Sequence, residues 1–228
     1  MAFTMRPATE ADLDRLVEIY FSAFKDNAIN VRVFPEASPQ SRAFWRKNLA
    51  DGLTEDFVHL QVVETAGDTT SGTASDSEAK KILAFAMWDA PLKATDPIPA
   101  MPPLSAWPSD GDVAAASEFF YDLERQHKRF MGPRQGAPAE EQQTPHWYLE
   151  LIATHRDFQG RGAAGALLRY GEQQADAAGL PCYLDATPDG RPVYTSAGQG
   201  FREVDSRFYL GGEYEHVFMI RDPRPSSS

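Results

Sequence analysis

The chain has 228 residues, 42% of them hydrophobic, and a formal net charge of −11 at pH 7, so it is long enough to bury a core of its own. Its 33 acidic residues against 22 basic ones argue against nucleic acid as a ligand. No apolar run approaches the roughly 18 residues of a membrane helix, and the first residues lack a secretory signal pattern, so we expect no membrane partner.

The cysteine and histidine content limits which cellular compartment and which metal sites are expected. Cys182 is the single cysteine, which excludes an intrachain disulfide and fits a reducing compartment, the cytoplasm or possibly the nucleus. One cysteine and five scattered histidines do not have zinc-ligand spacing. We therefore expect no metal site.

The first half of the chain predicts three strands and two helices. Residues 3–7 alternate as a strand does, and apolar residues then recur at helical spacing from Leu13 to Phe24. A second helix is predicted at 39–53. Strands at 57–64 and 81–88 are expected to pair as a hairpin, and the Gly/Ser/Thr/Asp-rich residues 66–79 between them predict a flexible loop.

Residues 90–145 interrupt this pattern of strands. They begin and end rich in proline, and between these ends a helix is predicted from about 112 to 131, with Phe119, His127 and Phe130 near one face. We interpret the segment as a helical insertion between the third and fourth strands.

The most informative stretch follows this insertion. Residues 146–154 read as a strand, 157–165 as a turn of small residues, and the next residues as a helix that ends at Gly179. The N–H groups of a first helical turn lack internal partners and carry the positive end of the helix dipole. With Arg156 and Arg161 at the turn, this pattern indicates a bound phosphate.

Two phosphate-binding motifs can be compared with this turn. A nucleotide-triphosphate loop would need a Gly-Lys pair that the chain does not have. Residues 160–165 fit a dinucleotide fingerprint in spacing, but too little chain follows for such a domain. The remaining elements are strands at 180–187, 201–210 and 215–221, a tyrosine segment at 190–194, and a tail at 223–228 that we expect to be disordered.

Gln159-x-x-Gly162-x-Ala164 resembles motif A of the GNAT superfamily, the Gcn5-related N-acetyltransferases, which holds the pyrophosphate of acetyl-coenzyme A (acetyl-CoA). The order of strand, tyrosine segment and Gly200-Phe201 that follows is similar to the same family. Residues 147–201 look most like small-molecule enzymes resembling puromycin N-acetyltransferase.

The resemblance implies an α/β fold in one domain at 1–222. Its mixed, mostly antiparallel sheet of about seven strands would have splayed fourth and fifth strands and about four flanking helices. The helical insertion at 90–145 would then cover the acceptor side of the cleft.

The resemblance also implies site residues. The strand edge at Leu151, Ile152 and Ala153 would bind the acyl-pantetheine arm, and Tyr194 would contact the coenzyme and protonate its thiolate as general acid. The pyrophosphate would be held by a set of residues at the turn: Arg156, Gln159, Gly160, Arg161, Gly162, Ala163 and Ala164.

Glu150 stands out on physical grounds, because a charge in the middle of a strand is costly if it is buried alone. Burial would also raise its pKa towards the range of a useful base. We therefore predict Glu150 as general base, acting through a water that His146 or Tyr148 positions. A carboxylate paired with a nearby arginine is the alternative.

Phe24, Tyr148 and Asp185 are candidate acceptor contacts, and residues 28–35 are a candidate substrate loop. The predicted function is acetyl-CoA-dependent N-acetylation of a primary amine, with a small molecule as the expected partner. A protein or peptide N-acetyltransferase and a non-catalytic acyl-CoA sensor are the alternatives. The sequence leaves open whether the chain is a monomer or a homodimer.

Overall fold

The computed structural model describes residues 3–66, 81–96, 98–133, 135–196 and 198–225. The loop predicted at 66–79 lies outside these residues apart from Ala66, and so do residues 226–228 of the predicted tail. The described strands form one sheet in the order β1-β2-β3-β4-β5-β7-β6. Only β4 and β5 pair in parallel. The predicted mixed and mostly antiparallel sheet is confirmed.

The strands are β1 (Phe3–Pro7), β2 (Val58–Thr65), β3 (Ile82–Asp89), β4 (Trp147–Thr154), β5 (Cys182–Ala186), β6 (Arg202–Tyr209) and β7 (Tyr214–Arg221). The helices are α1 (Leu13–Ala23), α2 (Ala28–Val33), α3 (Pro39–Gly52), α4 (Val113–Met131), α5 (Ala163–Ala178) and α6 (Arg191–Tyr194). Short 3-10 turns lie at Glu10–Asp12, Leu104–Ala106, Arg156–Phe158 and Leu210–Gly212.

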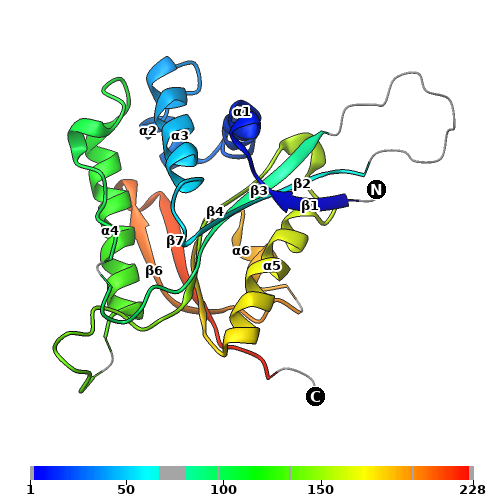
Figure 1. Cartoon of the computed structure of the whole chain (residues 1–228). Helices are drawn as coiled ribbons and strands as arrows, with labels where there is room; N and C mark the ends of the chain where they lie inside the picture. Colours follow the sequence, from blue (N-terminus) through cyan, green and yellow to red (C-terminus); the bar gives the residue numbers. More distant parts are fainter. Residues whose placement is uncertain (1–2, 67–80, 97, 134, 197, 226–228) are drawn as a thin grey trace, which may run out of the picture.

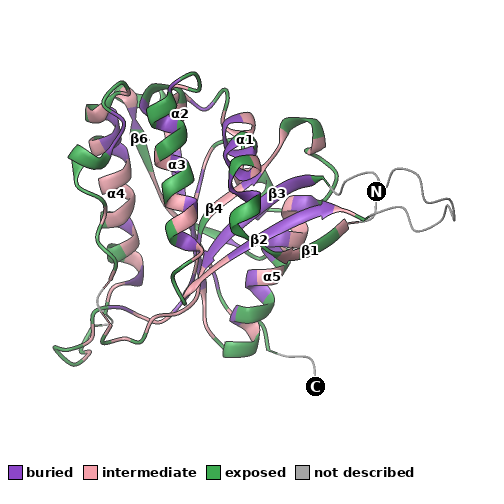
Figure 2. Cartoon of the chain, turned by 45° about the horizontal axis from the view of Figure 1, so that its top comes forward, coloured by how far each residue is buried: buried purple, intermediate pink, exposed green. Residues whose placement is uncertain are grey.

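Helices cover both faces of the sheet. Helices α1 and α3 pack on one face and α5 packs on the other (Figure 1). Leu16 and Phe85 belong to the core on the α1 side, and Leu167 and Trp88 to the core on the α5 side. Strands β2 and β3 lie between these layers and are mostly buried (Figure 2), in keeping with the almost wholly apolar sequence of β3.

Residues 28–35 were expected to form a loop, but they contain helix α2. The side chain of Asn27 caps this helix, because its Oδ1 accepts from the backbone N–H groups of Ile29 (3.1 Å) and Asn30 (3.0 Å). Asn27 Nδ2 donates to the Tyr214 hydroxyl at 2.9 Å, which ties the cap to β7. The prediction was wrong because the helix is short and rich in residues with modest helix propensity, so the long-range tie decides its conformation.

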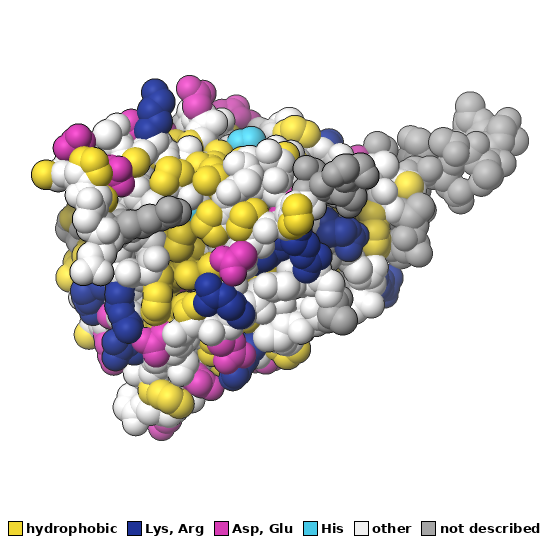
Figure 3. Space-filling view, turned by 90° about the horizontal axis from the view of Figure 1, so that it is seen from below, with side chains coloured by type: hydrophobic (Ala, Val, Ile, Leu, Met, Phe, Trp, Pro, Cys, Tyr) yellow, Lys and Arg dark blue, Asp and Glu magenta, His cyan; other side chains and the backbone are white. Residues whose placement is uncertain are grey.

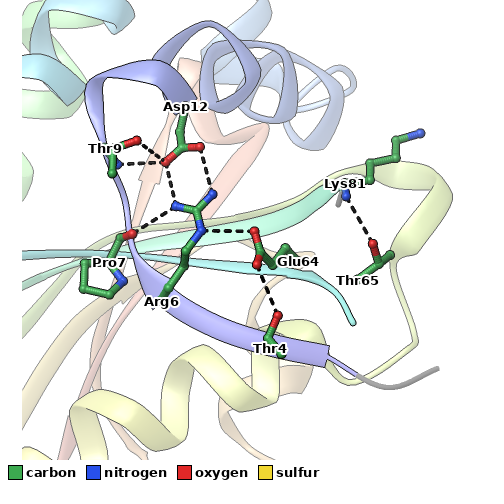
Figure 4. Close-up of polar contacts among 8 residues, drawn as sticks. All are labelled: Thr4, Arg6, Pro7, Thr9, Asp12, Glu64, Thr65 and Lys81. Carbon is green, nitrogen blue, oxygen red and sulfur yellow. Dashed lines mark hydrogen bonds and ion pairs between the residues drawn. The ribbon is translucent and has the colours of Figure 1, made fainter. Parts of the chain in front are cut away.

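The N-terminal strand is held by an arginine (Figure 4). Arg6 donates to both oxygens of Asp12 at 2.7 and 2.9 Å and to Glu64 at 3.0 Å, which joins β1 to the turn before α1 and to β2. The hydrogen bonds from Arg6 outweigh burial and lower the pKa of Asp12 to about 2. This contact fixes where α1 starts on the sheet.

On at least one face of the molecule, acidic side chains do not form a continuous patch (Figure 3). On the face seen from below, acidic and basic side chains are interspersed around a central group of apolar ones (Figure 3). Among the helices of the described residues, none combines the length and the apolarity needed to cross a membrane.

Helix α5 lies close to the sheet at Gly171. A Cβ atom built there would lie 2.3 Å from Cε2 of Trp88, whose side chain is fully buried. The Trp88 indole N–H donates to the carbonyl of Leu167 at 3.1 Å. The glycine therefore sets the distance between α5 and β3.

We predict that Gly171→Ala lowers the free energy of unfolding by about 1–3 kcal/mol, because the added methyl group would overpack a buried ring. The matched control is Gly165→Ala in the same helix, where the nearest atom to the new Cβ is the side-chain end of Arg169 at 3.4 Å. It should be neutral or stabilising by up to about 1 kcal/mol. Denaturant unfolding compares the two, and equal stability of both variants would contradict the packing argument.

Candidate active site

Strands β4 and β5 part in the middle of the sheet. They pair only at Trp147–Cys182, Tyr148–Tyr183 and Leu149–Leu184. Beyond Leu149, β4 continues to Thr154 and keeps its partners on β3, but it has none on β5. The predicted splay is confirmed, and one edge of β4 is left free to hydrogen-bond with a ligand.

Glu150 occupies a bulge at the point where the strands part. Its neighbours Leu149 and Leu151 pair with consecutive residues of β3, Trp88 and Met87, so Glu150 is the extra residue of β4. Its side chain is exposed although β4 is a central strand, which indicates a recess in the sheet at this point. Solvent reaches the carboxylate, but the surrounding protein removes much of its hydration and raises the pKa of Glu150 to about 7.

Two of the candidate acceptor contacts, Tyr148 and Asp185, are hydrogen-bonded to each other, and Tyr183 joins them. Asp185 accepts hydrogen bonds from the hydroxyl of Tyr183 at 2.8 Å (to Oδ1) and from that of Tyr148 at 3.1 Å (to Oδ2). Burial raises the pKa of Asp185 to about 7, although both hydroxyls favour its ionised form. Asp185 is therefore satisfied by tyrosines and forms no ion pair with Arg191, which pairs instead with Glu203.

Asp89, at the end of β3, is a site residue that the sequence analysis missed. It pairs in register with Tyr148, so the two side chains share a face of the sheet. Its Oδ1 is buried and has no hydrogen-bond partner among the described residues. Burial and then the charge of Glu150 raise the pKa of Asp89 well above its usual range.

His127 brings helix α4 to the same place. Its ring stacks on Tyr183 at a centroid distance of 4.7 Å, and its Nε2 lies 2.6 Å from Nε2 of His146. Nδ1 of His146 lies 2.6 Å from the carbonyl of Thr144 and must donate to it, so in the neutral pair the Nε2–H of His127 donates to His146. Burial and the neighbouring His146 lower the pKa of His127 to about 3.

This pairing bears on the role predicted for His146. Both of its ring nitrogens are committed, one to Thr144 and one to His127. Tyr148 likewise donates to Asp185. Both side chains are thus already hydrogen-bonded within the protein, and their role in positioning a water for Glu150 stays a prediction.

The turn between β4 and α5 forms a cradle of backbone amides. Gly160 and Gly162 have positive φ angles of 71° and 89°, and Gly162 is the N-cap of α5. A Cβ atom built at either glycine would meet no atom within 4 Å. Within the described part of the chain, the N–H groups of residues 160–165 have no hydrogen-bond partner. The residues present therefore fit a bound diphosphate.

The three polar side chains predicted to help hold the pyrophosphate make different contacts within the protein. Arg161 lies over the ring of Phe158, at 5.3 Å from its centroid, and is exposed. Gln159 donates from Nε2 to the carbonyl of Thr154 at 3.2 Å, which closes the turn. Arg156 forms an ion pair with Asp26 beyond α1, so its guanidinium anchors the turn to that helix. A direct contact of Arg156 with phosphate stays a prediction.

Tyr194 lies in the core on the α5 side of the sheet. It packs on Phe201 at 6.0 Å and is only 6% exposed. Its hydroxyl makes no hydrogen bond with any described residue. Burial and then the charge of Asp185 raise the pKa of Tyr194, so the phenol stays protonated at neutral pH.

Phe24 lies apart from the carboxylates. It lines a hollow of about 140 Å³ with Tyr20 and Phe34, between α1 and α2. A second hollow of about 380 Å³ continues from it to His155 and Arg156. Neither is lined by Glu150, Tyr148 or Asp185. Among the described residues, no group of three or more side chains is arranged to hold a metal ion.

Comparisons with known proteins agree with this fold. The structure is similar to a histone acetyltransferase HPA2-related acetyltransferase from Corynebacterium glutamicum (TM-score 0.58, 21% identity, 100% of both chains covered). It is also similar to arylalkylamine N-acetyltransferase 2 from Aedes aegypti (TM-score 0.65, 13% identity, 98% of this chain and 100% of that chain). A third is the ribosomal-protein-S18-alanine N-acetyltransferase from Escherichia coli (TM-score 0.52, 14% identity, 100% and 97%). At these identities the likeness shows the fold alone.

No curated protein matches the sequence significantly. A family model described as the acetyltransferase (GNAT) family matches residues 78–199 of the 228 residues. The match covers more than half of the chain and includes β4, the amide cradle and α5. This protein therefore belongs to the GNAT family of acetyltransferases.

Proposed function

We propose that the protein is an acetyl-CoA-dependent N-acetyltransferase that transfers the acetyl group directly to the primary amine of a small molecule. The observation that carries this proposal is the unpaired edge of β4, which leads from the amide cradle at 160–165 to Glu150. An extended pantetheine arm could add to that edge as a strand does.

In this proposal the coenzyme is held mainly by backbone. The N–H groups of Gly160, Arg161, Gly162, Ala163 and Ala164 bind its diphosphate, with the N-terminal dipole of α5 behind them. Gln159 holds the shape of the turn. The edge at 151–153 binds the arm, and one N–H there polarises the thioester carbonyl. Acetyl-CoA supplies the activated acetyl group.

Glu150 acts as the base. Its raised pKa leaves the carboxylate ready to take a proton near neutral pH, and its exposure lets an amine or a water reach it. As the amine attacks, an N–C bond forms to the acetyl carbon and the C–S bond breaks. The proton from the amine passes to Glu150, directly or through a water.

Tyr194 acts as the acid. Its hydroxyl has no hydrogen-bond partner among the described residues and stays protonated, so it can donate to the thiolate that leaves. In this proposal Glu150 and Tyr194 act on the reacting groups from either side of the open edge of β4. We propose a small acceptor because the aromatic rings of His127, Tyr148 and Tyr183 wall the recess beside Glu150.

The function is tested by thiol release from acetyl-CoA with a panel of primary amines and N-terminal peptides, with mass spectrometry of the products. We expect N-acetylated small amines from the wild type, and a loss of about 10²–10⁴-fold in kcat for Tyr194→Phe. An unchanged kcat would remove Tyr194 from the mechanism. Tight binding of acetyl-CoA without turnover of any acceptor would contradict the enzyme and favour a sensor.

The pH dependence tests the base. With the wild type, kcat/KM should rise with pH and approach a plateau above about 7, because only ionised Glu150 accepts the proton. Glu150→Gln should lower kcat/KM and remove the rise with pH that is due to ionisation of Glu150. Only the rise due to deprotonation of the substrate amine should then be left. The matched control is Glu140→Gln at an exposed position. A profile for Glu150→Gln with the same limb would assign the base to another group.

A further inference from the structure

Three carboxyl groups surround Tyr148 in the recess. Asp89 comes from β3, Glu150 from β4 and Asp185 from β5, so three neighbouring strands contribute one each. Burial and the charges of Asp185, Glu150 and Asp89 together raise the pKa of Tyr148, which means that all three act on this one side chain. Ionisation of these carboxyl groups would therefore concentrate negative charge in the recess.

No protein cation balances this charge. Among the described residues, none of the three carboxylates forms an ion pair, whereas Asp12, Asp176 and Glu203 are each paired with an arginine. The imidazoles of His127 and His146 are close by, but burial keeps them neutral. A cation that stabilises the ionised form of these groups would therefore have to arrive with a ligand.

Asp89 is the carboxylate with unused bonding capacity. Asp185 accepts from two tyrosine hydroxyls, whereas Asp89 accepts no hydrogen bond from any described residue, and its Oδ1 is shielded from solvent. An ionised carboxylate left in this way costs several kcal/mol. A donor that arrives with a ligand would remove that cost, provided it reaches the half-exposed side chain of Asp89.

The reacting nitrogen of the acceptor cannot stay the partner of Asp89 throughout acetyl transfer. Its proton passes to Glu150 as it attacks and it ends as a neutral amide nitrogen, so it keeps no charge to pair with Asp89. A monoamine would leave Asp89 without a partner as the reaction proceeds. The ring of His127 lies 4.3 Å from that of Tyr148, and such aromatic walls suit the apolar part and the positive end of an organic cation.

We propose that the acceptor is a diamine, or another amine with a second cationic nitrogen, and that Asp89 holds this second nitrogen while Glu150 receives the proton of the first. The proposal rests on the acetyl transfer proposed above. Neighbouring strands lie about 4.8 Å apart, so the two nitrogens should be separated by a short chain. Asp89 is in this account a specificity-determining residue that binds the acceptor.

The test compares 1-aminobutane with 1,4-diaminobutane, which share the same carbon chain, at a pH above 8 where Glu150 is ionised. For the wild type we expect kcat/KM to be at least about tenfold higher for the diamine, which corresponds to about 1.4 kcal/mol. Asp89→Asn should bring the ratio of the two values close to one. Asp56→Asn, at an exposed position with the same loss of charge, should keep the wild-type ratio.

The wild-type comparison stands even if Asp89→Asn does not fold. Equal kcat/KM values for the two amines would overturn the proposal, and so would an Asp89→Asn variant that folds and keeps the preference. Calorimetric titration of both amines in the presence of coenzyme A needs no turnover. Tighter binding of the diamine without acetylation of any amine would contradict the proposed function but would support the binding of a second nitrogen by Asp89. Acetylation of monoamines and diamines with equal kcat/KM would contradict only the role proposed for Asp89.

Discussion

The loss of pairing between β4 and β5 after Leu149 is the constraint on which the rest of the site depends. A continuous sheet would bury the backbone of residues 150–154 on both edges and would leave no recess beside Glu150. Because the strands part, one edge of β4 is unpaired and Glu150 becomes exposed in the middle of a sheet. Unpaired backbone in a protein interior is costly unless water or a ligand satisfies it.

The two ends of the unpaired edge of β4 favour ligands of opposite charge. At one end, the amides at 160–165 and the dipole of α5 favour an anion. At the other end, Asp89, Glu150 and Asp185 favour a cation. Such a division suits a reaction between a coenzyme with a diphosphate and an acceptor with an ammonium group, because each substrate is attracted to its own end.

Much of this fold follows from sequence patterns. The strand, glycine turn and helix from 146 to 179 are a local unit, since φ preferences, capping and helical spacing are all set by neighbouring residues. The same holds for α4, whose N-cap Asp112 accepts from the N–H of Ala115 at 2.9 Å. Helix α2 was missed because its cap, Asn27, is secured by a residue of β7.

The parts of the site that sequence reasoning missed depend on register and on long-range contacts. Asp89 looks like an ordinary strand-terminal aspartate until its pairing with Tyr148 and its lack of a partner are seen. His127 was noticed only as part of a helix face, and its contact with His146 fixes the tautomers of both rings. The ion pair that holds Arg156 joins residues far apart in the chain, so its predicted role at the phosphate could not take account of Asp26.

Amide hydrogen exchange with and without coenzyme A tests the central claim most directly. The amides of residues 150–154 that face away from β3, and those of 160–165, should exchange quickly in the free protein because they lack partners. Saturating coenzyme A should slow both sets together. Protection of these amides in the free protein, or binding that leaves both sets unprotected, would contradict the account.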